Sequence, residues 1–243
     1  MFGRKESIAI LISILIISFV FGFNDNSPGF DTNYWIMNFL RVLLIVTISL
    51  LLKETVIKSV AKRIGCESEY SIWNLRRYGF KEKEILEKGV PVASVLAILI
   101  ALIFNGKVFF TAIGNNIIKA NRELRIGRKF TRLDAYSEGL IIISGILVTA
   151  FLTIFFSFLD KISWVDFGLI ITINFWLTLW SLVPIPPLNA GRLFIGSRIR
   201  YVFTLGLVIV MFLLKDVNIL LNLALSLISA GLIMAIYYYL VEY

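Results

Sequence analysis

Two stretches of the sequence hold the side chains best suited to chemistry. The first, Leu51–Gly65, places Lys53 and Glu54 where an apolar segment gives way to charge. The second, Ser181–Leu193, combines a hydroxyl, three prolines and Asn189. A carboxylate can act as a general base, and a desolvated lysine amine can activate a serine hydroxyl. Either chemistry requires a fold that brings the two stretches together.

The composition indicates a membrane protein. Of the 243 residues, 58% are hydrophobic and 16% are charged, against about 25% charged residues in an average soluble domain. The mean hydropathy is +0.87. The sequence therefore predicts a multi-pass protein of the cell membrane, with membrane lipid as a partner. The net charge of +8 does not indicate nucleic acid as a partner, because the basic residues lie between apolar segments, where they set orientation.

Two features of the composition limit the chemistry. The chain has no histidine, which removes the usual zinc ligand and the commonest general base. Its one cysteine, Cys66, cannot form an intrachain disulfide. We expect this thiol to be inert, just past the end of a helix.

The apolar segments predict an all-α bundle in a single membrane domain, because a backbone inside the bilayer must satisfy its own hydrogen bonds. No Gly or Pro lies between Trp35 and Ile64, which favours one long helix there. Residues 89–118 hold two shorter apolar runs, predicted to form a re-entrant hairpin or, alternatively, two short spans. The six predicted spans are 7–23, 35–57, 139–159, 167–188, 201–214 and 217–241.

Charge predicts the orientation of these spans. With a cytoplasmic N-terminus, every basic segment falls on the inner face, as the positive-inside rule requires. The inner segments 1–6, 58–88, 119–138 and 192–200 have net charges of +1, +3, +3 and +3, and the outer segments 24–33, 160–166 and 215–218 have −2, −1 and 0.

This layout brings both chemical stretches to the inner ends of their helices. Lys53 lies about 18 residues after Trp35, roughly 27 Å along a helix. Asn189 follows the proline break at the inner end of span 167–188. We therefore expect the two stretches to lie at similar depth.

The first stretch resembles the site-2 protease family of intramembrane zinc metalloproteases, which has H-E-x-x-H-x-x-x-A-x-x-x-G on one helix. In that family two histidines one turn apart bind zinc and the glutamate activates a water. This chain has Glu54, Ala61 and Gly65 in that register, but Lys53 and Ile57 stand at the histidine positions.

The second stretch resembles the motif N-x-x-P-x-P-P-L-D-G-G of the same family, whose Asp is the third zinc ligand. Here Asn189 stands at the Asp position and Asn174 precedes the block. Gly145 keeps only the glycine of a further Gly-Pro-x-x-Asn element, and residues 65–70 look like archaeal members of the family. A broken helix at membrane depth is tolerated only where protein or water covers it, which makes Ser181, Pro184, Pro186, Pro187 and Asn174 candidates for substrate contact.

The departures from the family fall on the chemistry. Ile57 has no donor atom, an ammonium at Lys53 repels a cation, and Asn189 offers one neutral carbonyl, whereas zinc takes about four N, S or O donors. We therefore expect no metal and no cofactor. The resemblance implies a catalytically inactive homologue, a pseudoprotease that binds transmembrane segments of partner proteins.

Other interpretations stay open at this point. Lys53 could mark the end of its helix, or replace the charge of the metal beside Asn189, and Glu54 could form an ion pair with Lys58. A transporter or channel could use Lys53, Glu54 and Asn189 as an intramembrane polar site. A residual peptidase could act by non-zinc chemistry, for example through a pair of Ser181 and Lys53. The prolines could simply end a helix, and the 89–118 region could pack or gate entry.

Overall fold

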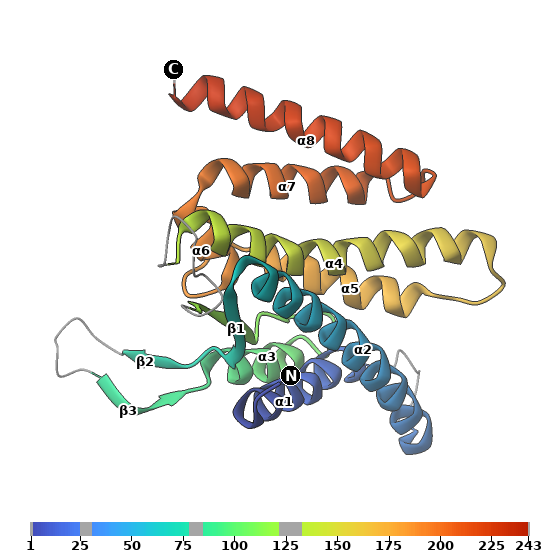
Figure 1. Cartoon of the computed structure of the whole chain (residues 1–243). Helices are drawn as coiled ribbons and strands as arrows, with labels where there is room; N and C mark the ends of the chain where they lie inside the picture. The colour runs from blue at the N-terminus through green and yellow to red at the C-terminus, as the bar shows by residue number, and fades with distance from the viewer. Residues whose placement is uncertain (1, 25–30, 78–84, 122–132, 243) are drawn as a thin grey trace. The chain divides into compact units, whose positions relative to one another are not determined.

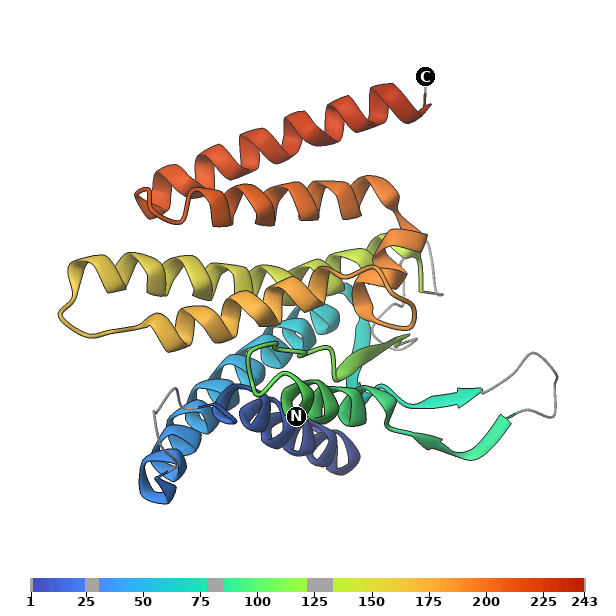
Figure 2. The same ribbon diagram turned by 180° about the vertical axis from the view of Figure 1, so that it is seen from behind.

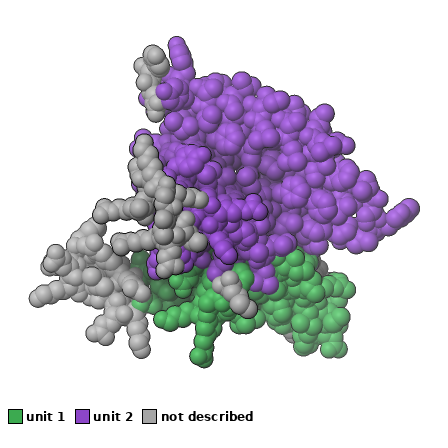
Figure 3. Space-filling model, in the orientation of Figure 1, with its two compact units in different colours: residues 1–50, 69–117 green, residues 51–68, 118–243 purple. Residues whose placement is uncertain are grey.

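The computed structural model describes residues 2–24, 31–77, 85–121 and 133–242, and within these ranges the chain is mostly helical, with eight helices. The chain forms two compact units (Figure 3). Unit 1 comprises Met1–Leu50 and Glu69–Ile117, and unit 2 comprises Leu51–Ser68 and Ile118–Tyr243. The sequence predicted one membrane domain. The helix α2 (Thr32–Ile64) and the strands β1 (Cys66–Ile72) and β4 (Gly114–Ala120) each contribute residues to both units.

Four helices are long and apolar enough to cross a membrane. A helix of 18 residues extends about 27 Å, close to the thickness of the hydrocarbon core. These four helices support a multi-pass membrane protein. They are α1 (Arg4–Gly22), α2 (Thr32–Ile64), α4 (Ala135–Ile162) and α8 (Ile219–Glu242).

The other four helices are shorter. The predicted spans 167–188 and 201–214 correspond to helices of 15 and 16 residues, and the first stops at Leu182. It stops there because Pro184 lacks an N–H and disfavours helical geometry in the residue before it. The shorter helices are α3 (Val92–Ile103), α5 (Gly168–Leu182), α6 (Asn189–Gly196) and α7 (Arg198–Leu213).

The structure also contains four short strands, so the all-α prediction is wrong in this respect. They are β1 (Cys66–Ile72), β2 (Leu75–Arg77), β3 (Ile85–Val90) and β4 (Gly114–Ala120). In β1, buried Cys66, Ser68 and Tyr70 alternate with exposed Glu67 and Glu69. This period of two is typical of a strand with one buried face. The strand was not predicted, because its acidic residues made the segment look merely polar.

The strands form two pairs. β1 pairs with β4, and β2 pairs with β3 antiparallel. Trp73 N donates to Ile113 O at 2.9 Å beyond one end of the first pair, and Asn121 N donates to Gly65 O at 3.1 Å beyond the other. These bonds make β1 and β4 antiparallel.

Residues 89–118 differ from both predicted forms, because only the first apolar run is a helix, α3. The chain then turns through Asn105 and Gly106, whose φ angles are 50° and 67°. A Cβ on Gly106 would lie 2.8 Å from Asn24 Cβ, so this position requires glycine. The second run continues without helix into β4. Its apolar side chains pack inside unit 1, where Phe109 stacks on Phe21 with ring centroids 4.6 Å apart.

In unit 1, α1 and α3 lie side by side (Figures 1 and 2). A buried carboxylate ties α1 to β1, because Glu6 Oε1 accepts from Tyr70 N at 3.0 Å. The Tyr70 hydroxyl donates to Ser13 Oγ at 2.9 Å. The helix α1 and the strand β1 are therefore joined by polar contacts that are shielded from solvent.

In unit 2, α4 packs along α5, and α7 packs along α8 (Figures 1 and 2). The buried core joins the C-terminal part of α2 to α4, α6 and α7. Its largest fully buried members include Ile57, Ile141, Ile146, Ile154 and Leu193. The candidate site lies against this core, entirely within unit 2.

Candidate functional site

One face of α2 packs against a glycine of α4. A Cβ built on Gly145 would lie 2.5 Å from Ile57 Cδ1 and 3.6 Å from Lys53 Cε. Residues four apart share one face of a helix, so Lys53 and Ile57 both point at this glycine. Ile57 is 1% exposed. The two positions where the resemblance expects histidines are therefore held against α4, where a side chain at position 145 would displace them.

The amine of Lys53 reaches across to α5. Its Nζ donates to Ser181 Oγ at 2.7 Å, although the two residues are 128 positions apart in the chain. The Ser181 hydroxyl in turn donates to Leu177 O at 2.6 Å, one helical turn back. This contact brings together the two chemical stretches of the sequence, with both side chains partly buried.

The proline segment follows directly after this contact. Pro184, Pro186 and Pro187 are exposed and have no helical structure. Gly191 packs closely against this segment, because a Cβ built on it would lie 2.6 Å from Pro186 N. The Tyr201 hydroxyl donates to Leu182 O at 3.0 Å, which satisfies a carbonyl at the end of α5. The fold therefore presents an exposed, non-helical strip, residues 184–187, beside the Lys53–Ser181 pair.

Asn189 begins α6 and contacts an arginine of the same helix. Arg192 Nη2 donates to Asn189 Oδ1 at 2.8 Å, and Arg192 Nη1 lies 2.9 Å from Glu138 Oε1. Burial lowers the pKa of Arg192, and the nearby Glu138 acts in the opposite direction. A guanidinium nevertheless remains charged in proteins. The amide carbonyl at the third metal-ligand position therefore already accepts a bond from a cation.

Two further residues named by the sequence analysis are buried. Glu54 is 1% exposed and Asn174 is 0% exposed. Asn174 Nδ2 donates to Ile170 O at 3.0 Å. Thr178, one turn on from Asn174, donates to Thr149 Oγ1 at 2.8 Å and so connects α5 to α4. In this structure the side-chain amide of Asn174 bonds within α5, and Thr178 makes the contact with α4.

The donor chemistry does not fit a zinc ion. Within the ranges that the structure describes, no group of three or more His, Cys, Asp or Glu side chains could hold a metal. The Lys53 amine acts here as a hydrogen-bond donor to Ser181 and not as a metal ligand. Ile57 has no polar atom that could bind a metal. Zinc takes about four N, S or O ligands. The arrangement can instead hold a lysine amine beside a serine hydroxyl at the edge of an exposed strip.

Sequence reasoning missed the roles of Arg192 and Glu138. It treated Arg192 only as an inner-face charge, and the two residues are 54 positions apart. No local spacing rule relates such distant residues. It also missed Leu177 as the acceptor for Ser181, although a serine inside an apolar helix often donates to the carbonyl four residues back.

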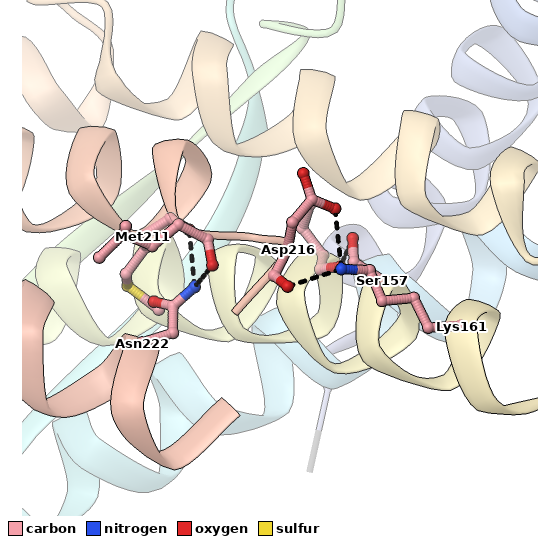
Figure 4. A network of polar contacts seen from close by, with 7 residues as sticks. Ser157, Lys161, Met211, Asp216 and Asn222 are labelled. Atoms are coloured by element: carbon pink, nitrogen blue, oxygen red, sulfur yellow. Dashed lines mark hydrogen bonds and ion pairs between the residues drawn. The ribbon is translucent and has the colours of Figure 1, made fainter. Parts of the chain in front are cut away.

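A second polar network lies in unit 2, where α4 ends near the loop between α7 and α8 (Figure 4). Lys161 Nζ lies 3.0 Å from Asp216 Oδ1 and donates to Asp216 O at 2.7 Å. Asn222 Nδ2 donates to Met211 O at 3.0 Å and to Leu214 O at 2.8 Å. The Asn222 amide of α8 satisfies two carbonyls at the C-terminal end of α7. The Lys161–Asp216 ion pair joins the loop between α7 and α8 to α4.

Comparisons with models of known protein families, with curated proteins and with solved structures found no match. The structure itself supports the class of a multi-pass membrane protein, through its four long apolar helices.

Proposed function

We propose that this chain is a site-2-protease-like membrane protein that has no zinc chemistry and binds transmembrane segments of partner proteins. In this proposal α5 and α7 also lie in the membrane, which gives six spans, and the Lys53–Ser181 pair lies toward the inner face. The exposed strip at residues 184–187 is the observation that carries the binding function. The side chains at positions 53, 57 and 189 support the loss of zinc.

Each of these three positions has a different environment from that of a metal ligand. The amine of Lys53 bonds to Ser181, and Asn189 Oδ1 accepts from Arg192. Ile57 packs on Gly145. A metal at these positions would have to displace the Arg192 guanidinium from Asn189 and the amine of Lys53 from Ser181. The desolvation of the Lys53 amine is offset in part by its hydrogen bond to Ser181.

The strip supports binding because of its backbone. Prolines donate no N–H, so residues 184–187 have more carbonyl acceptors than donors. Irregular backbone at membrane depth is tolerated only where protein or water covers it. Pro184, Ile185, Pro186 and Pro187 are all exposed in this chain. A partner transmembrane segment packed on this strip would supply that cover.

The transporter alternative, with Lys53, Glu54 and Asn189 as its polar site, has less support, because Lys53 bonds to Ser181 and Asn189 accepts from Arg192. The hydroxyls of the neighbouring helix α4 are likewise engaged. The hydroxyls of Thr153 and Ser157 donate to carbonyls of their own helix, at 2.9 and 2.8 Å. The Thr149 hydroxyl likewise donates to Ile146 O at 3.1 Å. All three side chains are at most 6% exposed. Hydroxyls inside apolar helices commonly donate to a carbonyl one turn back in the same helix, and this role accounts for them.

The binding proposal can be tested by site-specific photo-cross-linking in native membranes. A photoreactive residue at Ile185, which is 46% exposed, is compared with one at Ile209 of α7, which is 47% exposed. We expect position 185 to cross-link to a defined transmembrane peptide that position 209 does not reach. The same peptide, made synthetically, should bind the purified chain in liposomes, and binding should weaken with Ile185→Lys. Identical profiles at the two positions would contradict the proposal.

The loss of zinc has its own test. We expect metal analysis of the purified chain to give far less than one zinc per protein. Lys53→His, Ile57→His and Asn189→Asp together restore the ligand types of the family, and zinc affinity should then appear. Stoichiometric zinc in the natural chain, with cleavage that depends on Glu54, would overturn this part of the proposal.

A further inference from the structure

The contact between Lys53 and Ser181 has the geometry of a nucleophile and its base. We propose that Ser181 and Lys53 form a serine–lysine pair that cleaves an amide bond of a bound transmembrane segment. This inference rests on the proposed function, because the bound segment is the substrate. The Nζ–Oγ distance of 2.7 Å lies within the range of 2.6–3.2 Å from which a general base can take a proton.

Ser181 differs from four buried hydroxyls of α4 and α5. Thr149, Thr153, Ser157 and Thr178 are at most 6% exposed, and their bonds go to carbonyls or to one another. Ser181 contacts an amine, is partly exposed and lies in the last turn of α5 before the proline strip. Among these hydroxyls, Ser181 is the one that contacts a base, is partly exposed and lies next to a surface for a substrate.

The position of Lys53 is fixed by packing. Its Cε lies 3.6 Å from the point where a Cβ on Gly145 would be, and Ile57 fills the neighbouring space. A lysine held against a helix loses less rotamer freedom at the moment of reaction than a mobile one. An amine in an apolar site can serve as the base for a hydroxyl nucleophile.

The reaction conserves atoms and charge. The Ser181 proton, now donated to Leu177 O, turns to the neutral amine of Lys53 as Oγ bonds to the carbonyl carbon. The C–N bond then breaks, and Nζ gives that proton to the departing amine. An ester of Ser181 remains. Water then attacks the ester, and Lys53 takes a proton from that water. Lys53 gives this proton to Ser181 Oγ as the ester bond breaks and the carboxylic acid leaves. Water is the only co-reactant.

The test uses a fluorophosphonate probe, which forms a covalent adduct with an activated serine. The full chain is labelled in detergent, and the adduct is measured by intact mass and mapped by peptide analysis. We expect one adduct, on Ser181, that Ser181→Ala removes. Lys53→Arg should slow labelling by at least about 100-fold, because a guanidinium stays protonated and a general base contributes 10²–10⁴ in rate. Ser59→Ala is the control, since that serine is exposed and bonds to Thr55 O.

The outcomes separate this inference from the proposed function. No adduct on folded natural chain, or equal labelling in Lys53→Arg, would overturn the serine–lysine pair. If Lys53→Arg does not fold, Lys53→Met takes its place with the same expectation. Cross-linking from Ile185 does not depend on the hydroxyl and should persist in Ser181→Ala. Cross-links without an adduct would therefore reject the pair alone, whereas an adduct without cross-links would reject the binding proposal.

Discussion

Two lysines of unit 2 show how differently one side chain can be used. Lys53 is partly buried, packs against α4 and bonds to the neutral hydroxyl of Ser181 at 2.7 Å. Lys161 has a side chain that is 43% exposed and pairs with Asp216, which is 68% exposed, at 3.0 Å. The first is held by packing, donates to a neutral hydroxyl and has the buried carboxylate of Glu54 next to it in the chain. The second has a full counter-charge and water.

The difference shows where the chain depends on its polar contacts. An exposed ion pair contributes little, because water already solvates both charges. A buried donor that loses its acceptor costs more than the bond was worth, because the group stays desolvated. We therefore expect changes around Lys53 to have large effects and changes around Lys161 to have small ones.

The largest effect should follow from filling the space beside Lys53 and Ile57. In Gly145→Leu the new Cβ alone would lie 2.5 Å from Ile57 Cδ1. Because Ile57 is fully buried, the helices must separate, which we expect to cost about 3 kcal/mol. Thermal unfolding in detergent measures this, and the fluorophosphonate labelling of Ser181 should fall with it.

Gly231→Leu is the matched control for that change. Gly231 is also within a long helix, α8, but a Cβ there would meet nothing within 4 Å. Its effect on the unfolding temperature should be slight. Equal losses at positions 145 and 231 would show that the packing of α2 on α4 does not hold Lys53 in place.

Removing the acceptor of Lys53 should have the next largest effect. Ser181→Ala leaves the amine without this partner in a partly buried site, at a cost of about 1–2 kcal/mol. Lys53→Met with Ser181→Ala removes both groups and should recover most of the loss. A double-mutant cycle in unfolding free energy measures the coupling. Additive costs would mean that the two side chains do not interact.

The sequence allowed the long helices to be predicted, because their apolar runs are at least 17 residues long and lack internal prolines. It also suggested that positions 53 and 189 lie near the same end of their helices. The strands were not recognised. β1 carries Glu67 and Glu69 on its exposed face. Its buried residue Tyr70 contacts Glu6 and Ser13 of α1, which are distant in the sequence.

The contacts of the candidate site were harder to predict than its residues. Sequence analysis paired Lys53 with Asn189 as one option and gave Ser181 as another. Which acceptor an amine meets depends on the rotation of α5 and on where Pro184 ends it, and neither follows from hydrophobic pattern. The Arg192–Glu138 ion pair joins α6 to the first turns of α4, and no spacing rule links such distant residues.

A smaller effect is expected at the second network, from Asn222→Ala. Asn222 is 0% exposed, and its amide donates to Met211 O and Leu214 O. Interhelical bonds of this kind in membrane proteins average about 0.6 kcal/mol and reach about 1.7. We expect a loss within that range, measured by unfolding in detergent. Ser59→Ala, a serine outside this network, should leave stability unchanged.

The smallest effect should come from the exposed ion pair, and it should depend on pH. The hydrogen bond from Lys161, with the charges of Lys161 and Lys215, lowers the pKa of Asp216 below its usual 3.8. A depressed carboxyl pKa stabilises the fold above the unfolded value, and this contribution disappears as pH falls through the folded value. Asp216→Asn should therefore lower the unfolding temperature slightly at pH 7 and match the natural chain at the lowest pH at which both stay folded. Because both side chains are solvated, a large difference at neutral pH would mean that this end of α4 is as dependent on its lysine as the packed site around Lys53.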